Sequence, residues 1–388
     1  MPLRNRLEMA QALQQVMSHA YAQLQDRQHL EADSSLLKTY LVEAHSDTGN
    51  QRDTLRLLRV AFGTEYLGAR AESQVQESEE NLFFNVTIHY GRFEATFHVD
   101  ATERRYWVVH STSKSTQADH ILQRVILQHP SLDSVWLPMQ LLERVTQLGS
   151  FRGLGLDYDR RKVPDVDFEA DDAPVEFLKM QLWGNRAGEI LRVLRHQNAF
   201  PESTTLSKVK VKHWLDREHD QDAFSVSDVK YDGKITARGT SFLSHISLVS
   251  TVTRDYSRNI QDFETRFALH FERQPNGRSQ LNGEPLAVKF GRPIADIEVF
   301  LEKVFSGAAP FRLSGVPVRV RGQLYRVVAV DLHVSQTVTF EITPEFMRIF
   351  LPRGSCGNTV ARLYTNLQHY YDSTVELRTG DGVRVFES

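Results

Sequence analysis

The segment from Phe242 to Phe267 has the strongest helical pattern in the chain. Its apolar residues recur at steps of three or four, as Phe242, Ile246, Val249, Val252, Tyr256, Ile260, Phe263 and Phe267. So long an apolar stripe must be covered by other elements along its whole length, because a helix with one apolar face is stable only against a core. We therefore expect a long central helix over residues 242–268.

Alternating apolar and polar residues predict antiparallel strands that pack against this helix and others. Phe84 to Tyr90 and Phe93 to Val99 alternate on either side of Gly91, a pattern typical of a hairpin with one apolar face. Residues 318–342 fit a three-strand meander near the C-terminus. We predict an α+β fold, with a helical N-terminal lobe followed by antiparallel sheets packed with amphipathic helices.

A chain of 388 residues is too long for one ordinary core, since cores stop growing at about 250–300 residues. Residues 3–24, 37–44 and 55–62 show helical spacing, and the polar stretch Gln74–Asn81 reads as an exposed connector. We expect a helical lobe over residues 1–73, a mixed α+β domain over 82–200 and a β-rich domain over 201–388.

Composition limits the compartment and the partners. The formal net charge is only −3, so the chain offers no global field for a polyanion, and a nucleic-acid site must be a local patch. Cys356 is the one cysteine, which excludes an internal disulfide and a multi-cysteine zinc site. The sequence has no run of the ~18–20 apolar residues that span a membrane and no apolar signal core at the N-terminus. We expect a soluble cytoplasmic protein without a membrane partner.

Two predicted strands carry basic residues at two-residue steps. Such residues project from one face of a strand and can follow a phosphate backbone, with an aromatic ring nearby to stack on a base. The competing interpretation is an ordinary solvated face, since sheets often expose lysines. The candidate nucleic-acid contacts are Lys208, Lys210, Lys212, Trp214, Arg319, Arg321, Tyr325 and Arg326.

A metal-dependent nuclease is an alternative interpretation that uses Asp165, Glu176 and Lys179. Carboxylates would hold a hard cation that activates water, and a lysine would stabilise the phosphate charge. Two residues separate Glu176 from Lys179, whereas one residue between them would place both side chains on the same face of a strand. This spacing favours a charged surface segment.

Two further clusters contain reactive residue types. His213, Asp216, His219 and Asp220 are possible metal ligands, but the helical step of four residues between histidines is absent. Cys356 precedes a predicted helix that carries His369, but a glycine-rich turn with Asn358 or Thr359 as the helix cap is the favoured explanation of this segment. The chain has neither a phosphate-binding P-loop nor a dinucleotide fingerprint, so we predict no cofactor and no metal site.

These features favour a binding or assembly protein that contacts nucleic acid or a protein partner through basic strand faces. The alternatives are the nuclease above and a purely structural interaction subunit, and a homo-oligomer fits each of them. Membership of a bacterial multi-protein system such as antiviral defence is a hypothesis that rests on no motif.

Overall fold

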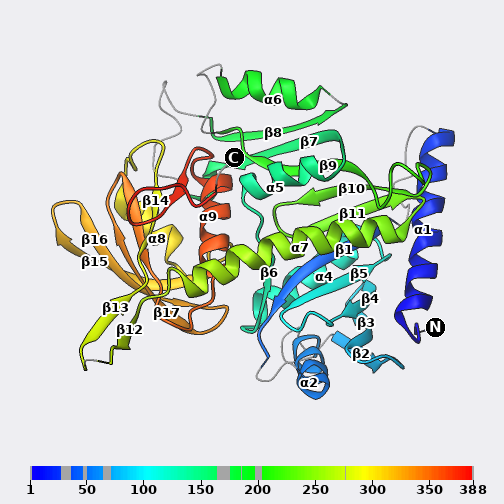
Figure 1. The fold of residues 1–388 in the computed structure, drawn as a ribbon, viewed down its shortest axis with the longest axis horizontal. Coiled ribbons are helices and arrows are strands. Elements are labelled where there is room, and N and C mark those ends of the chain that lie inside the picture. The colour runs from blue at the N-terminus through cyan, green and yellow to red at the C-terminus, as the bar shows by residue number, and fades with distance from the viewer. Residues whose placement is uncertain are drawn as a thin grey trace. The chain divides into compact units, whose positions relative to one another are not determined.

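A computed structural model describes residues 2–27, 36–46, 50–63, 71–163, 175–184, 186–196, 203–275 and 277–386. The chain divides into two compact units built from interleaved segments. Unit 1 comprises Met1–Val135, Val145–Phe151 and Lys210–Arg254, and unit 2 comprises Trp136–Arg144, Arg152–Val209 and Asp255–Ser388. The predicted α+β class is confirmed (Figure 1). The expected boundaries near residues 73 and 200 stay a prediction.

Unit 1 is built on an antiparallel sheet with strand order β2-β3-β4-β5-β1-β11-β10, and a short strand, β6, pairs with β1. The strands are β1 (Leu37–Ala44), β2 (Ala71–Glu77), β3 (Phe83–Tyr90), β4 (Phe93–Asp100), β5 (Tyr106–Ser111), β6 (Leu132–Ser134), β10 (Phe224–Lys230) and β11 (Lys234–Gly239). The predicted hairpin over residues 84–99 is β3 and β4, in which Phe83 pairs with Asp100 and Tyr90 with Phe93.

Helices cover this sheet because their apolar stripes match its buried residues. They are α1 (Arg6–Arg27), α2 (Gln51–Ala61), α4 (Ser115–Gln128) and the first part of α7 (Phe242–Thr265). Ile121 and Val125 of α4 join a core with Phe97 of β4, and Met17 of α1 joins a smaller one with Phe242. The side chain of Asn50 caps α2 by accepting a hydrogen bond from the Asp53 backbone N–H.

Two local predictions for the N-terminal region were wrong. The second helical run, over residues 37–44, is the central strand β1, all of whose residues are buried. A strand buried on both faces loses the alternation that identifies strands, and its apolar residues can mimic helical spacing. The expected connector at Gln74 begins inside β2, an edge strand whose polar residues face solvent.

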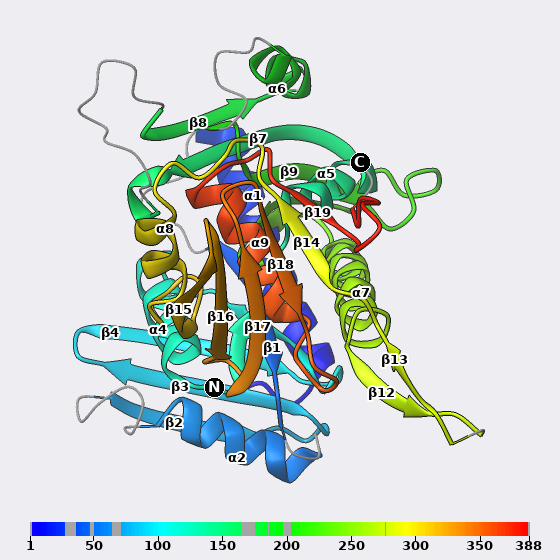
Figure 2. The same ribbon diagram turned by 90° about the vertical axis from the view of Figure 1, so that its left-hand side faces the viewer.

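Unit 2 contains a six-stranded antiparallel sheet of order β15-β16-β17-β18-β14-β19. Its strands are β14 (Leu286–Lys289), β15 (Leu313–Arg321), β16 (Leu324–Asp331), β17 (Gln336–Ile342), β18 (Phe346–Phe350) and β19 (Glu376–Arg378). The predicted meander is the run β15-β16-β17, visible side by side in Figure 2. Helices α8 (Ile297–Val304) and α9 (Asn358–Tyr370) also belong to this unit.

Helix α9 is buried on all sides, including its polar residues. Several of those residues have partners from distant segments, since the Asn358 side chain accepts a hydrogen bond from the hydroxyl of Tyr256 and the Met139 N–H donates to Gln368. A helix with polar residues all round is stable inside a protein only when such partners exist.

The rest of unit 2 consists of smaller elements. They are α5 (Met139–Val145), β7 (Ser150–Asp159), β8 (Phe177–Trp183), α6 (Ala187–His196) and the hairpin of β12 (His270–Arg273) and β13 (Ser279–Asn282). Strand β9 (Leu206–Trp214) and helix α7 carry residues of both units. Within the described ranges, no helix is both long and apolar enough to cross a membrane.

Candidate protein-interaction surface

The lysines of β9 lie on one side of the strand, but each contacts a neighbouring side chain. In unit 1, the Lys210 ammonium lies 3.4 Å from Asp228, and Lys212 Nζ lies 3.5 Å from the ring centre of Phe224. In unit 2, Lys208 Nζ lies 5.1 Å from the ring centre of Trp183. A polyanion would compete with these contacts, which weakens the case for this face as a phosphate site.

Trp214 closes the same strand in unit 1. Its indole N–H donates to the Gln221 carbonyl oxygen at 3.0 Å, and Lys212 and Arg217 both lie 4.9 Å from its ring centre. The ring is only half-buried, and the two cations are those of this chain itself.

The basic residues of the β15–β16 hairpin are divided between its two faces. Tyr325 lies on the buried face, where its hydroxyl donates to the Glu298 carboxylate at 2.6 Å, so its ring does not present a stacking surface. Arg319, opposite Tyr325, donates from Nε to the Gly322 carbonyl oxygen, and Arg321 is exposed close to the hairpin turn. Arg326 lies on the other face, paired with Glu341 at 2.7 Å.

That other face of the hairpin is apolar and exposed. Register pairs Val316 with Val328, and Val318 with Arg326, so these side chains project from the same side of the sheet. The exposed fractions are 77% for Val316, 59% for Val318, 48% for Val320, 57% for Val328 and 36% for Val330. Contiguous exposed apolar surface of this kind makes this face a candidate binding site.

The valines border a hollow of about 580 Å³, which we call the valine hollow. It is lined by Ser314, Gly315, Val316, Val318, Val320, Arg326 and Val328. Gly315 pairs with buried Ala329, so a Cβ there would project to the buried side of the sheet, 2.8 Å from Val327 Cγ1 and 2.9 Å from Ala329 Cα. Glycine at this position allows the close approach of β15 to β16 behind the hollow.

A second exposed surface lies on the edge strand β8, where Phe177, Lys179, Gln181 and Trp183 share one face. The rings of Phe177 and Trp183 are 47% and 52% exposed. On the neighbouring strand β7, Gly153 and Gly155 pair with Trp183 and Gln181, and the side chains of Trp183 and Lys208 pack over these glycines.

The nuclease candidates do not form a described cation site. Lys179 pairs in register with Asp157 of β7, while the Glu176 carboxylate lies 3.8 Å from Arg161. Asp165 lies outside the described residues. The nuclease role stays a prediction, to be tested by magnesium-dependent cleavage and its loss in Glu176→Ala.

The residues of the other two candidate clusters lie apart from one another or are buried. The His213 ring lies 2.6 Å from the Leu148 carbonyl oxygen, whereas exposed His219 pairs with Asp216. Cys356 is buried just before α9, and His369 lies at the far end of that helix, about 18 Å along its axis.

Unit 1 has a buried polar cluster at its central strand. The Thr39 hydroxyl lies 2.9 Å from His110 Nδ1 and 2.8 Å from His245 Nε2. Both rings are fully buried, and burial lowers the pKa of each histidine to about 3. Two neutral imidazoles and one hydroxyl can satisfy each other, because the hydroxyl donates to one ring and accepts from the N–H of the other.

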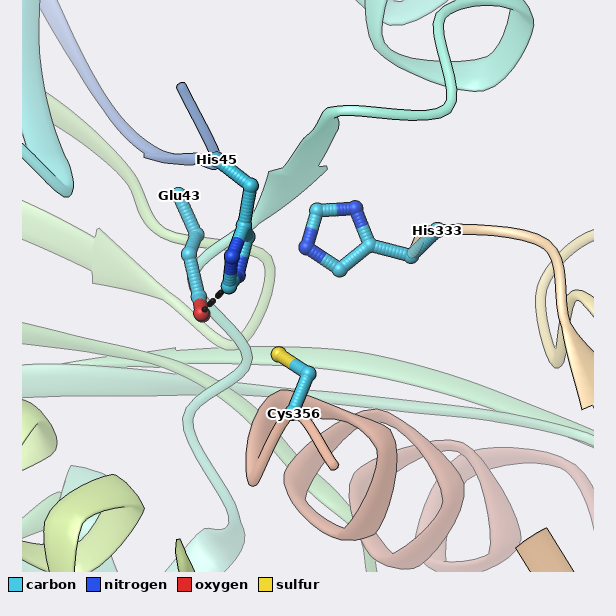
Figure 3. Close-up of side chains that lie close together, drawn as sticks. All are labelled: Glu43, His45, His333 and Cys356. Carbon is cyan, nitrogen blue, oxygen red and sulfur yellow. Dashed lines mark hydrogen bonds and ion pairs between the residues drawn. The ribbon is translucent and has the colours of Figure 1, made fainter. Parts of the chain in front are cut away.

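A second cluster of unit 1 involves the same strand. The buried Glu43 carboxylate accepts from Arg105 Nε at 2.8 Å and Nη2 at 2.6 Å. It also lies 3.1 Å from His45 Nε2 (Figure 3). His45 also lines a polar cavity of about 190 Å³ with Arg56 and His129. The Arg105 guanidinium neutralises the Glu43 carboxylate, and the same carboxylate holds the His45 ring in position.

In unit 2, Asp331 is the centre of a buried ion pair. It accepts hydrogen bonds from Arg362 and Thr359, and its Oδ1 also accepts from the His333 N–H at 2.9 Å. His333 and Cys356 are both buried, and Figure 3 shows them on the turn after β16 and at the start of α9. These groups tie the meander to α9.

The valine hollow is absent from the predicted sites, because the valines of residues 318–342 predict only the strands of the meander. A signal for it does exist in the sequence. Both alternating sets of β16 are apolar, Val327 and Ala329 on one side and Val328 and Val330 on the other. A strand that is apolar on both faces is either fully buried or holds an apolar surface for a partner.

The chain is similar over nearly its full length to a protein from an archaeon. The "Uncharacterized protein MJECL33" of Methanocaldococcus jannaschii is 26% identical over 404 residues, which cover 96% of this chain and 93% of that protein. The family model described as MJECL33-like protein matches residues 1–385. The chain therefore belongs to the family of MJECL33-like proteins.

Proposed function

We propose that this chain is an assembly protein that binds another protein through the exposed face of the β15–β16 hairpin. The observation that carries the proposal is the row of five exposed valines on that face. Burying apolar surface contributes about 25 cal/mol per Å², so an apolar partner gains much of its binding free energy there.

The chemistry of the valine hollow favours protein over nucleic acid. Phosphates need hydrogen-bond donors and cations, whereas five of the seven residues around the hollow are glycine or valine. Arg326, the one cation among them, is already paired with Glu341. An apolar segment of protein fits this lining, with polar contacts at its rim.

A second candidate function, binding of single-stranded nucleic acid, is supported by β8. Two half-exposed aromatic rings lie six residues apart on one strand face, a spacing of about 20 Å, with Lys179 between them. Base stacking on such rings does not depend on sequence. The charges nearby are mixed, since Asp157 lies opposite Lys179, so stacking would supply more of the affinity than phosphate contacts.

A cytoplasmic location and membership of a larger bacterial system, as in antiviral defence, also stay proposals. These proposals depend on the valine hollow, because a partner that binds there must be in the same compartment as this chain.

The native mass of the protein in extracts of its host tests the proposal. Wild-type protein should migrate in a complex heavier than one chain, and a Val318→Asp/Val328→Asp variant should migrate as a single chain. Arg348→Asp is the matched control, because Arg348 is exposed on the same sheet face, two strands from β16. A double variant that keeps the full complex mass would refute the proposal.

A further inference from the structure

The hairpin of β12 and β13, which we call the arm, pairs with no other strand among the described residues. Phe271 and Leu281 lie opposite each other in its register, so both project from one face. Phe271 is 74% exposed and Leu281 is 55% exposed. The opposite face carries Glu272 and Gln280, which also pair.

The apolar face of the arm is expected to pack against another surface. A two-stranded hairpin is marginally stable in water by itself, and an exposed Phe–Leu pair adds an unfavourable apolar surface. The described residues of unit 2 leave this pair uncovered. The partner must therefore bring an apolar surface that can accept two large side chains.

The valine hollow has the required character. Its volume of about 580 Å³ falls in the range of ~300–1,000 Å³ that holds whole ligands, and its valines leave no buried polar group to satisfy. The arm of the same chain lies elsewhere, because it leads into β14, whereas β15 is at the other side of the strand order. Figure 2 shows the arm extending on the β14 side of the sheet, away from β15.

We infer that the arm of one copy docks Phe271 and Leu281 into the valine hollow of a second copy. This inference rests on the proposed function and names the partner as the chain itself. Two unmatched apolar features, one projecting and one concave, occur in one unit of one chain. Arm-in-hollow docking covers both of them, whereas an outside partner for the hollow leaves the arm exposed.

The hollow accepts the arm face-on and does not extend the sheet. β15 is an edge strand, but Pro317 in its middle has no N–H to donate, which disfavours the addition of a further strand. Contact through the valine face avoids this obstacle.

Arm-in-hollow docking is heterologous, since each copy gives an arm to one neighbour and a hollow to the other. Repetition of such a contact builds closed rings or open chains. Two docked side chains of at most about 250 Å² each together bury less than the ~800 Å² per partner of a standard interface, so we expect association in the micromolar range.

Sedimentation velocity of the purified full-length chain tests the inference from about 1 to 100 µM, the range such an interface implies. Wild-type protein should form dimers and larger species as concentration rises. Two variants should each weaken association at least tenfold. Phe271→Asp removes the projecting ring of the arm, and Val318→Asp places a charge in the hollow. Gln280→Lys, opposite Glu272 on the other face of the arm, is the control for a charge added to the arm and should associate like wild type.

A mixture of the two defective variants gives the decisive test. Phe271→Asp keeps an intact hollow and Val318→Asp keeps an intact arm, so an equimolar mixture should form heterodimers and nothing larger. Hollow-to-hollow docking would instead leave Phe271→Asp fully associated and give no complementation. Either that pattern or a wild-type chain that stays monomeric throughout would overturn the inference.

The two proposals fail separately. A purified chain that is monomeric while Val318→Asp/Val328→Asp still loses the complex in host extracts contradicts self-docking and keeps the assembly function. Unchanged complex mass in that variant contradicts both. Circular dichroism and thermal melting of each variant exclude misfolding as the cause of lost association.

Discussion

Acidification should destabilise unit 1 through the two histidines that flank Thr39. Their pKa values are about 3 in the folded chain and about 6.5 when unfolded. Both rings are neutral in either state above pH 6.5, so stability is fully present there. As the pH falls from 6.5 towards 3, the unfolded chain takes up protons that the folded chain refuses, and stability is lost.

The size of this effect follows from the two pKa values. When the pH falls from 7 to 5, protonation stabilises the unfolded chain by about 2 kcal/mol for each of these histidines. The two histidines together give about 4 kcal/mol. His245→Gln removes one of these two contributions. The variant should therefore lose about 2 kcal/mol less than wild type between pH 7 and pH 5, although it is less stable than wild type at both.

Hydrogen exchange of peptides from β1 and β11 measures this effect in unit 1 alone, after correction for intrinsic exchange rates. The opening free energy should fall by more than about 4 kcal/mol from pH 7 to pH 5 in wild type, because partly buried His98 of β4, with a folded pKa of about 4, adds to the loss from the other two histidines. His219→Gln is the control, since that side chain is exposed, and it should keep the wild-type difference. Equal protection at both pH values, or an unaltered loss in His245→Gln, would refute the reasoning.

Three further changes test other parts of the structure. Thr39→Val leaves both ring nitrogens without their hydroxyl and should cost about 1–3 kcal/mol of unit 1 stability in the same exchange experiment; equal stability would contradict the hydrogen bonds. Arg362→Met leaves buried Asp331 without its cation and should cost about 3–5 kcal/mol of stability in denaturant unfolding. The double variant Arg362→Met/Asp331→Leu should recover part of that loss, and no recovery would argue against a charge effect. Trp183→Ala should weaken binding of labelled poly(dT) by about 1–3 kcal/mol if β8 binds single strands, and unchanged anisotropy titrations would remove that candidate.

Local patterns predicted much of the fold. The expected helix over 242–268 is α7, from Phe242 to Thr265, because its apolar stripe faces a core along its length. The hairpin over residues 84–99 and the C-terminal meander follow from alternation in the same way. Strand β1 escaped prediction, since its complete burial erased the alternation.

The functional surface could be predicted only in part. Basic residues at alternate positions indicated which strands are two-sided, but not that Lys210 contacts Asp228, or that Tyr325 is buried against Glu298. The Thr39 cluster joins residues 71 and 206 positions apart, which no local pattern can indicate. Exposure of the valine face depends on which side of the sheet other elements cover, and that packing is a tertiary property.

Site-specific photo-crosslinking in host cells tests the central claim most directly. A photoreactive residue replaces Val318 in the valine hollow, or Arg348 on the same sheet face as the control. We predict a defined protein adduct from position 318 and none from position 348. Position 318 giving no adduct, or the same adducts as position 348, would contradict the claim that the valine hollow binds a protein.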